Sequence, residues 1–361
     1  MNTTYNFAAG PAQLPAAVLE QARELWFAQA DDGSTALERP FTGAAFGAAL
    51  ALARARLAAL LALPDNYHIL FLAGGATHQF SMVPLNLLGD ATCVAYADSG
   101  HWSQRAMGEA GRYADVTVAA RYPGAQALAA PPLGRWQLPD DCAYCHITPN
   151  ETADGIAYPG LPDCGSVPLV ADVTSCLLTA PLEVARYGLL YAAAQKNLGI
   201  AGMTVVIVRD DLLRRPAPLA PSAFNYRLQA AQGSRVNTPP MLAIELAGMM
   251  FDWIAQQGGL AAMQASGQRK AALLYGAIDG SGGFFRAPVA PGHRSPVNVR
   301  FELAEPALTG RFLAHAAQCG LHNLGGHGHF GGLRASLYNA MPEAGVHALI
   351  ACMADFMRRL G

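Results

Sequence analysis

Lysine is scarce in this chain of 361 residues: Lys196 and Lys270 are the only two, and the other basic residues are arginines. Arginine replaces lysine wherever a positive charge is all that is needed. Lys196 nevertheless lies in the apolar, glycine-containing segment 191–202. Because a primary amine condenses with an aldehyde and a guanidinium does not, this position predicts a covalent role for Lys196.

Charged residues are also scarce, at 14% of the chain against 52% hydrophobic residues. A monomer needs more surface charge, so this composition predicts an extensive subunit interface. The net charge of −2 gives no support for nucleic acid or an anionic membrane as a partner. No run of 18 apolar residues is free of charge, Gly or Pro, which argues against a membrane-spanning helix. Residues 1–15 lack the basic segment and apolar core of a signal peptide, so we expect a cytoplasmic enzyme.

The seven cysteines are an odd number spread along the chain, which suits reduced thiols better than a disulfide framework. Residues 142–146, with the sequence CAYCH, match the C-x-x-C-H signature of covalent haem attachment. The segment is nevertheless typical of a buried strand, and covalent haem attachment normally implies export. We therefore interpret Cys142 and Cys145 as ordinary strand cysteines and expect neither haem nor a metal.

Seven short apolar runs alternate with helical patterns between about residue 68 and residue 210. Runs that are buried on both faces and separated by helices predict an α/β fold with a mostly parallel sheet. Residues 240–278 have a helical pattern and lead into a C-terminal part with an α+β pattern, in which residues 296–303 and 332–339 are the expected strands. We expect two domains: a large one at residues 16–255, and a small one at residues 1–15 and 256–361.

Two polar residues follow predicted strands at the sheet edge where α/β folds bind ligands. Lys196 comes directly after the apolar run 188–195, and Asp172 ends the run 167–172. A lysine that forms a Schiff base, with an aspartate at a pyridinium nitrogen, is the arrangement of pyridoxal phosphate (PLP) enzymes. The alternatives are a lysine that extends from a strand end into solvent and an aspartate that caps the next turn.

Three further segments have the character of ligand contacts. Residues 74–75 are glycines before a helical pattern, so the N–H groups of Ala76 and Thr77 can face a phosphate. Trp102 follows another predicted strand, where its indole can stack on a flat cofactor or belong to the core. Arg334 can bind a substrate carboxylate or form a surface ion pair.

The longer motifs occur in an order that gives the chain a specific resemblance. They are NFAAGPAQLP, FLAGGATHQF, SGHW, HITPNETADGI, VADVTS, YAAAQKNLGIAG, NTPP and GGLRASLYNAMP. With them the chain resembles, nearly from end to end, the phosphoserine aminotransferases, which are class-V, fold-type I PLP enzymes. The resemblance implies amino transfer in serine biosynthesis, with the family reaction O-phospho-L-serine + 2-oxoglutarate = 3-phosphooxypyruvate + L-glutamate. It also implies a homodimer with active sites at the subunit interface.

The resemblance implies a role for individual residues. Lys196 would bind PLP and then carry a proton between substrate and cofactor, while Asp172 would hold the pyridine nitrogen. Arg334 would bind the substrate's α-carboxylate, and His327 would also contact substrate. The other expected cofactor contacts are Ala76, Thr77, Trp102, Thr152 and Gln195, joined by Asn237 and Thr238 from the second subunit.

The chain departs from the family at the distal end of the substrate. Where the family usually has S-H-R-G, residues 40–43 read Pro-Phe-Thr-Gly, and Gly328 stands where a cation usually follows the histidine. Those cations bind the substrate's phosphate, and each charge-assisted contact is worth about 1.5–3 kcal/mol. Because Phe41, Thr42 and Gly328 replace the cations of the family, the sequence predicts a substrate shifted away from phosphoserine. Phe41 and Phe330 indicate that the substrate has an uncharged or aromatic side chain, unless both phenylalanines only pack against other parts of the protein.

Three alternatives stay open. The enzyme can be an authentic phosphoserine aminotransferase whose phosphate site is rebuilt from cations near the altered motifs, namely Arg39, His78, His327, His329 and Arg235. It can be a PLP enzyme of another reaction class, catalysing β-elimination, β-replacement or decarboxylation. The third alternative is a non-catalytic binding protein, against which the retention of Lys196 and Asp172 argues.

Overall fold

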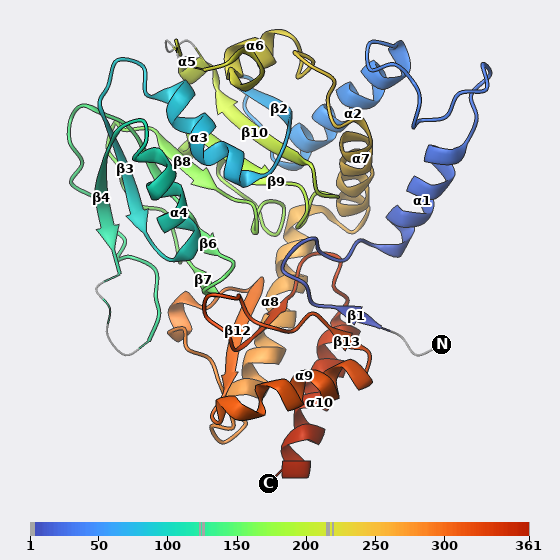
Figure 1. The fold of residues 1–361 in the computed structure, drawn as a ribbon, viewed down its shortest axis with the longest axis vertical. Coiled ribbons are helices and arrows are strands. Elements are labelled where there is room, and N and C mark those ends of the chain that lie inside the picture. Colours follow the sequence, from blue (N-terminus) through green and yellow to red (C-terminus); the bar gives the residue numbers. More distant parts are fainter. Residues whose placement is uncertain (1–3, 123, 125–126, 214–216, 219, 361) are drawn as a thin grey trace.

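A seven-stranded sheet forms the centre of the molecule in the computed structural model, which describes residues 4–122, 124, 127–213, 217–218 and 220–360 (Figure 1). β10 is antiparallel to both of its neighbours, and the other adjacent strands are parallel. The prediction of a mostly parallel, seven-stranded sheet is therefore confirmed. Its strands, in spatial order, are β2 (Tyr67–Ala73), β10 (Met203–Arg209), β9 (Leu189–Ala193), β8 (Leu169–Asp172), β5 (Cys142–Ile147), β3 (Cys93–Asp98) and β4 (Asp115–Arg121).

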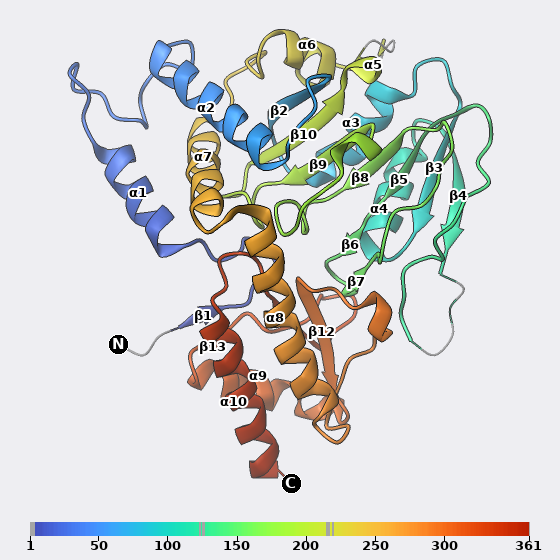
Figure 2. The same cartoon turned by 180° about the vertical axis from the view of Figure 1, so that it is seen from behind.

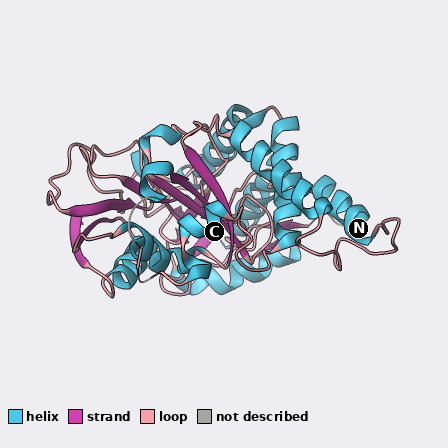
Figure 3. Ribbon diagram, turned by 90° about the horizontal axis from the view of Figure 1, so that it is seen from above, coloured by secondary structure: helices cyan, strands magenta, loops and turns pink. Residues whose placement is uncertain are grey.

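Helices cover both faces of this sheet (Figure 3). Successive side chains of a strand point to opposite faces, so Ile69 and Phe71 of β2 pack on one side and Leu70 and Leu72 on the other. Burial on both faces explains why the strands read as continuous apolar runs. The first face packs against α2 (Ala44–Leu60) and α7 (Met241–Gln256), and the second against α3 (Ala76–Leu87), α4 (His101–Ala110), α5 (Asp210–Leu213) and α6 (Tyr226–Ala231).

The C-terminal part has its own small sheet and its own core. α8 (Gly259–Asp279) leads from α7 into it (Figure 2). An aromatic cluster of Phe285, Phe301, Phe312 and Phe356 fills the space between sheet and helices. The expected α+β arrangement is present, and the domain boundary near residue 255 stays a prediction. The elements are β11 (Phe285–Arg286), β12 (Asn298–Leu303) and β14 (Leu333–Ser336), paired antiparallel, with α9 (Thr309–Gln318) and α10 (Glu343–Leu360).

The N-terminal segment ties this C-terminal part to the large sheet. β1 (Tyr5–Asn6) pairs in parallel with β13 (Leu321–His322). Further along, the hydroxyl of Tyr338 donates to the carbonyl of Ala9 (2.7 Å), and the N–H of Ala12 donates to the carbonyl of Gln195 (2.8 Å). The segment then enters α1 (Ala16–Phe27), which extends away from the sheet beside α7 (Figure 1).

The remaining elements are short. None of the helices within the described residues combines the length and apolar character needed to cross a lipid bilayer. All seven cysteines are free thiols, and Cys142 and Cys145 are buried in β5, as the interpretation of CAYCH as a strand requires. The short elements are β6 (Asn150–Glu151), β7 (Ile156–Ala157) and the 3-10 turns Val184–Arg186, Ser222–Phe224, Pro291–His293 and Pro306–Leu308.

Candidate active site

The candidate active site is a pocket at the edge of the large sheet where β2, β3, β5, β8 and β9 reach their carboxyl ends. Segments that follow parallel strands meet at this edge, which is where α/β folds bind ligands. The pocket brings together seven of the nine predicted cofactor contacts: Ala76, Thr77, Trp102, Thr152, Asp172, Gln195 and Lys196. Its other lining residues are Gly75, Thr148, Asn150, Thr174, Ser175 and Ala193.

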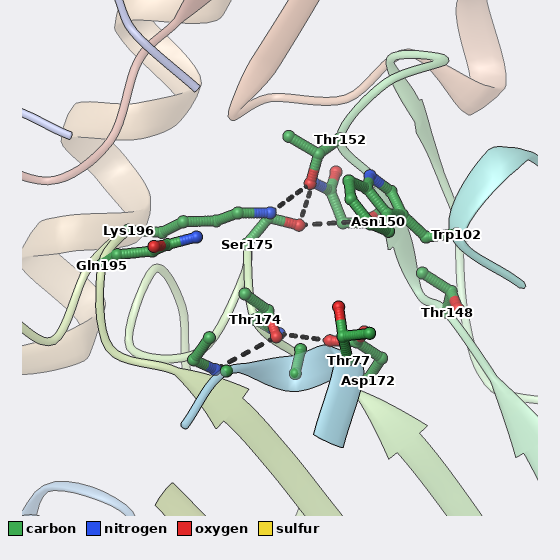
Figure 4. Close-up of a pocket in the computed structure, with 13 residues that line it drawn as sticks. Thr77, Trp102, Thr148, Asn150, Thr152, Asp172, Thr174, Ser175, Gln195 and Lys196 are labelled. Carbon is green, nitrogen blue, oxygen red and sulfur yellow. Dashed lines mark hydrogen bonds between the residues drawn. The ribbon is translucent and has the colours of Figure 1, made fainter. Parts of the chain in front are cut away.

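Lys196 crosses the pocket from the segment after β9 (Figure 4). Its Nζ donates a hydrogen bond to Oγ1 of Thr152 at 2.6 Å. Burial lowers the pKa of Lys196 to about 8, although the negative charge of Asp172 acts in the opposite direction. A substantial fraction of this amine is therefore neutral, and so nucleophilic, slightly above neutral pH.

Asp172 ends β8 and lies on the floor of the pocket. One oxygen of its carboxylate accepts the N–H of Thr174 at 3.0 Å. Burial raises the pKa of Asp172, and the hydrogen bonds from Thr174 and the charge of Lys196 only partly offset this effect. A cationic partner within the pocket would stabilise the ionised form of this buried carboxylate.

A buried polar chain lies behind Asp172 within the sheet. Tyr191 of β9 is in register with Asp172, and a hydrogen bond from its side chain lowers the pKa of Asp172. The Tyr191 hydroxyl also lies 2.8 Å from Nε2 of His146, the histidine of the CAYCH segment. Burial lowers the pKa of His146 to about 3, so the imidazole is neutral at physiological pH. This histidine orients Tyr191 through that contact.

The N-terminus of α3 opens into the pocket. Gly74 has a φ of +110°, which suits glycine and sets the tight turn from β2 into the helix. The first N–H groups of a helix have no intrahelical acceptors, so those at Ala76 and Thr77 can bind an anion. Gln195 lines the same pocket. His78, one of the cations considered from the sequence, accepts the N–H of Gly75 with its Nδ1 at 3.0 Å.

Two buried carboxylates fix the position of Trp102 on the opposite wall. Glu151 accepts the N–H groups of Trp102 and Ser103, both at 2.9 Å, and Asp154 accepts that of His101 at 3.0 Å. These bonds satisfy the open N-terminus of α4. A Cβ at Gly100 would lie 2.7 Å from Oδ2 of Asp154, so a glycine is needed for this approach. Burial, reinforced by the charge of Asp154, raises the pKa of Glu151 to about 8.

Three histidines gather beside Trp102. The ring centre of His327 lies 4.5 Å from that of His101 and 6.2 Å from that of Trp102, and His329 lies 5.7 Å from His101. Burial lowers the pKa of both His101 and His327, and the neighbouring cationic groups add to this effect. We call His101, His327 and His329 the imidazole cluster.

Arg300 adds a permanent positive charge beneath the imidazole cluster. Its guanidinium lies 4.9 Å from the ring centre of Phe330, which contacts all three histidines edge-on or tilted. Nη2 of Arg300 donates to Glu302 at 3.0 Å, while the buried Nε has no partner. The sequence did not identify Arg300 or His101, because their positions, 300 and 101, lie far from each other and from 327–330.

Arg334 lies next to the pocket on β14. Its Nη1 donates to the carbonyl of Thr152 at 3.2 Å, which places the guanidinium beside the residue that Lys196 contacts. The buried Nε of Arg334 has no partner. The guanidinium therefore keeps donor capacity for a carboxylate at this end of the pocket.

The remaining predicted site residues lie elsewhere in the chain. Asn237 and Thr238 are exposed in the segment between α6 and α7 and do not line the pocket. Phe41 packs against the core of its own chain, so packing explains this residue. Arg39, another cation considered from the sequence, lies 3.5 Å from the buried carboxylate of Glu245. Thr42 and Gly328 carry no charge, and their place in the distal substrate site stays a prediction.

Several further residues that line or support the pocket were not identified from the sequence patterns. Thr148 and Asn150 follow β5, and Thr174 and Ser175 follow β8, so their positions just after predicted strands were an available signal. Glu151 also follows β5, but nothing in the sequence indicates that its carboxylate accepts N–H groups at the start of α4.

Comparisons with known proteins agree with this geometry. The family model described as aminotransferase class-V matches residues 4–349. A phosphoserine aminotransferase of Stenotrophomonas maltophilia (strain K279a) is 46% identical over 361 residues, covering 100% of both chains. The structure of a phosphoserine aminotransferase from Bacillus circulans subsp. alkalophilus superposes with a TM-score of 0.96 at 41% identity, covering 99% of both chains. The PLP-bound phosphoserine aminotransferase from Trichomonas vaginalis gives a TM-score of 0.91 at 38% identity, over 98% of this chain and 100% of that one.

Proposed function

The chain belongs to the class-V aminotransferases and is a PLP-dependent transaminase, and from that premise we propose that it exchanges the amino group between O-phospho-L-serine and 2-oxoglutarate. The full-length relatives carry the name of that activity. The observation that carries the proposal for this chain is the imidazole cluster with Arg300 beside Trp102, which offers an anion site where the expected cations are missing.

The residues of the pocket fit PLP. Lys196 supplies the primary amine, Asp172 a carboxylate that lacks a full cationic partner, and the N-terminus of α3 a seat for a phosphate. Trp102 supplies a flat wall. The hydroxyl of Thr148 is buried at the pocket wall without a protein partner, so it is available to bond a ligand.

The cofactor and the side chains of the pocket have separate roles in the reaction. When bound, PLP supplies an electron sink for the bond that breaks at the substrate's α-carbon. Lys196, once its amine is free, carries the proton that leaves this carbon, and Thr152 holds the amine in place at 2.6 Å. Arg334 binds the α-carboxylate, which fixes the α-carbon next to Lys196. Asp172 stays ionised against the positive charge of the ring nitrogen.

The imidazole cluster receives the substrate's distal anion in this proposal. His327 and His329 come from the segment before β14 and His101 from the start of α4, and the fold brings the three rings together, with those of His101 and His327 next to Trp102. Neutral imidazoles donate one hydrogen bond each and take up a proton when an anion binds. Arg300 supplies the permanent charge that Thr42 and Gly328 lack.

A homodimer completes the proposed site. Asn237 and Thr238 are exposed on their own chain and do not line its pocket, so they are available to contact the cofactor of a second subunit. Apolar side chains are exposed along α1 and towards α2, which is the surface expected of an interface. They are Leu19, Leu25, Phe27, Leu37 and Leu52. A cytoplasmic location stays a prediction from the sequence.

The test is a half-reaction assay on the PLP-loaded enzyme, which follows the visible absorbance of the cofactor. We expect phosphoserine and L-glutamate to bleach it with a kcat/KM at least about tenfold above that of L-alanine or L-phenylalanine, since one charge-assisted contact is worth about 1.5–3 kcal/mol. Arg300→Gln and His329→Ala should each lower kcat/KM for phosphoserine by about tenfold or more. His347→Ala, an exposed histidine on α10, is the matched control.

The same assay decides the alternatives. Bleaching by aromatic or uncharged amino acids in preference to phosphoserine would support the substrate shift predicted from Phe41, Thr42 and Gly328. Products of β-elimination or decarboxylation would point to another reaction class.

A further inference from the structure

A cluster of metal-binding side chains lies between α9 and α10, in the C-terminal part and away from the pocket lining. Both helices pack side by side next to the C-terminus in Figures 1 and 2. One ring nitrogen of His315 and the Sγ atoms of Cys319 and Cys352 all lie within 4.8 Å of one another. We propose that these three side chains, together with Asp355, bind a zinc ion that links α9 to α10.

The sequence spacing on each helix places the proposed metal ligands on the faces of α9 and α10 that meet. His315 and Cys319 are four residues apart at the end of α9, and Cys352 and Asp355 are three residues apart on α10, so each pair shares one face of its helix. A tetrahedral zinc site with bonds of about 2.0–2.3 Å needs ligand atoms about 3.5–3.8 Å apart. The donor atoms of His315, Cys319 and Cys352, within 4.8 Å of one another, are at most about 1 Å further apart than this.

The imidazole of His315 has the environment of a metal ligand. Its ring is held against Phe356, with centres 5.6 Å apart. Its Nε2 is buried and makes no hydrogen bond, although an oxygen of Asp355 lies 3.3 Å away. A buried ring nitrogen without a partner is costly, and a bound cation would remove that cost. The Asp355 oxygen lies beside this same nitrogen, so the two atoms are placed to bind one cation.

The donor set selects the metal class. Two thiolates and one imidazole favour zinc over magnesium or calcium, which prefer oxygen ligands. Cys352 is buried, so a thiolate at this position needs a cation to offset its charge. Cys319 is exposed and gives a metal access from solvent. Arg358 and Arg359, within 3.3 Å and 2.7 Å of Asp355, offset the negative charge.

The proposal is tested with cobalt(II) as a spectroscopic substitute for zinc, added to the reduced PLP-loaded enzyme. We expect one cobalt per chain, intense tetrahedral bands in the red where PLP does not absorb, a thiolate charge-transfer band, and displacement by one equivalent of zinc. The absence of these bands at one equivalent of cobalt would overturn the proposal. So would a disulfide between Cys319 and Cys352 in protein prepared without an oxidant.

Variants identify the ligands. Cys319→Ser changes an exposed side chain and should weaken cobalt binding at least about 100-fold, and Asp355→Asn about 10–100-fold. Cys164→Ser is the matched control, because Cys164 contacts Cys145 in the large sheet and lies outside the cluster. Cobalt bands that persist in Cys319→Ser, or that disappear in Cys164→Ser, would contradict the assignment.

Discussion

At the residue scale, the scarcity of lysine makes the covalent role of Lys196 easy to test. Borohydride reduction of the PLP-loaded enzyme should attach the cofactor to the peptide that contains Lys196, and leave the peptide of Lys270 unmodified. Lys270 donates to the carbonyls of Tyr338 and Met341 at 2.9 and 2.8 Å, which explains its presence structurally. Peptide mass spectrometry gives the answer, with the second lysine as an internal control.

Lys196→Arg should keep the fold and lose the visible band of the bound cofactor. We expect its turnover to fall by about 10²–10⁴-fold or more, since it removes both the amine and the group that carries the proton. Circular dichroism checks the fold, and a transamination assay measures the loss. Near wild-type turnover would contradict the assignment.

The imidazole cluster predicts a pH dependence that only a substrate with a distal anion shows. His101 and His327 have lowered pKa values, so they are neutral at pH 7 in the free enzyme and gain a proton when an anion binds. The charged groups around them are Asp154, Arg105, Arg300 and Arg334. The KM for phosphoserine should therefore rise by up to about tenfold per pH unit between about pH 7 and 8.5.

L-alanine is the reference substrate for this measurement. It lacks a distal anion but shares the α-amine, the α-carboxylate and Lys196, so the ratio of the two KM values isolates the cluster. A ratio that does not change with pH would mean that the histidines do not bind the distal group.

At the scale of elements, α4 depends on carboxylates that come from β6 and the turn after it. Glu151→Ala leaves the N–H groups of Trp102 and Ser103 without acceptors. Loss of such a cap costs about 0.5–2 kcal/mol, and each buried donor left unsatisfied costs about 1–3 kcal/mol. We expect a loss of about 2–4 kcal/mol in the free energy of unfolding of the cofactor-free protein, and weaker PLP binding.

Urea unfolding and a PLP titration by tryptophan fluorescence measure both effects. Gln104→Ala, an exposed position on the same helix, should stay within about 0.5 kcal/mol of the wild type. Unchanged PLP affinity in Glu151→Ala would show that Trp102 does not depend on this cap.

The elements also show what sequence patterns could and could not predict. The seven strands of the large sheet were predictable because burial on both faces produces continuous apolar runs. α1 and α2 were missed, and α2 has apolar residues around its whole circumference, which weakens the helical period. β1 and β13 are two residues long, and only their pairing identifies them. The position of the pocket was predictable from the carboxyl ends of the strands. The imidazole cluster and Arg300 were not predictable, because they depend on contacts between segments that are distant in the chain.

At the scale of the whole molecule, the exposed apolar residues of α1 predict the assembly. Phe27 is 65% exposed and Leu25 is 44% exposed. The double variant Leu25→Asp, Phe27→Asp should shift the protein from dimer to monomer and weaken PLP binding by about tenfold or more, since Asn237 and Thr238 would no longer reach a second pocket. Sedimentation equilibrium measures the assembly, and Leu133→Asp, at another exposed leucine, is the control. A wild-type monomer with full PLP affinity would refute the dimeric site.

The N-terminal segment has a consequence for how the chain folds. Tyr5 and Asn6 pair with Leu321 and His322 of β13, more than 300 residues away in the chain. The same segment holds the backbone at Gln195, next to Lys196, through Ala12. The backbone beside Lys196 is therefore held by a segment whose own strand pairing depends on residues more than 300 positions further along the chain. Completion of the pocket is thus coupled to the docking of the C-terminal part on the N-terminal segment.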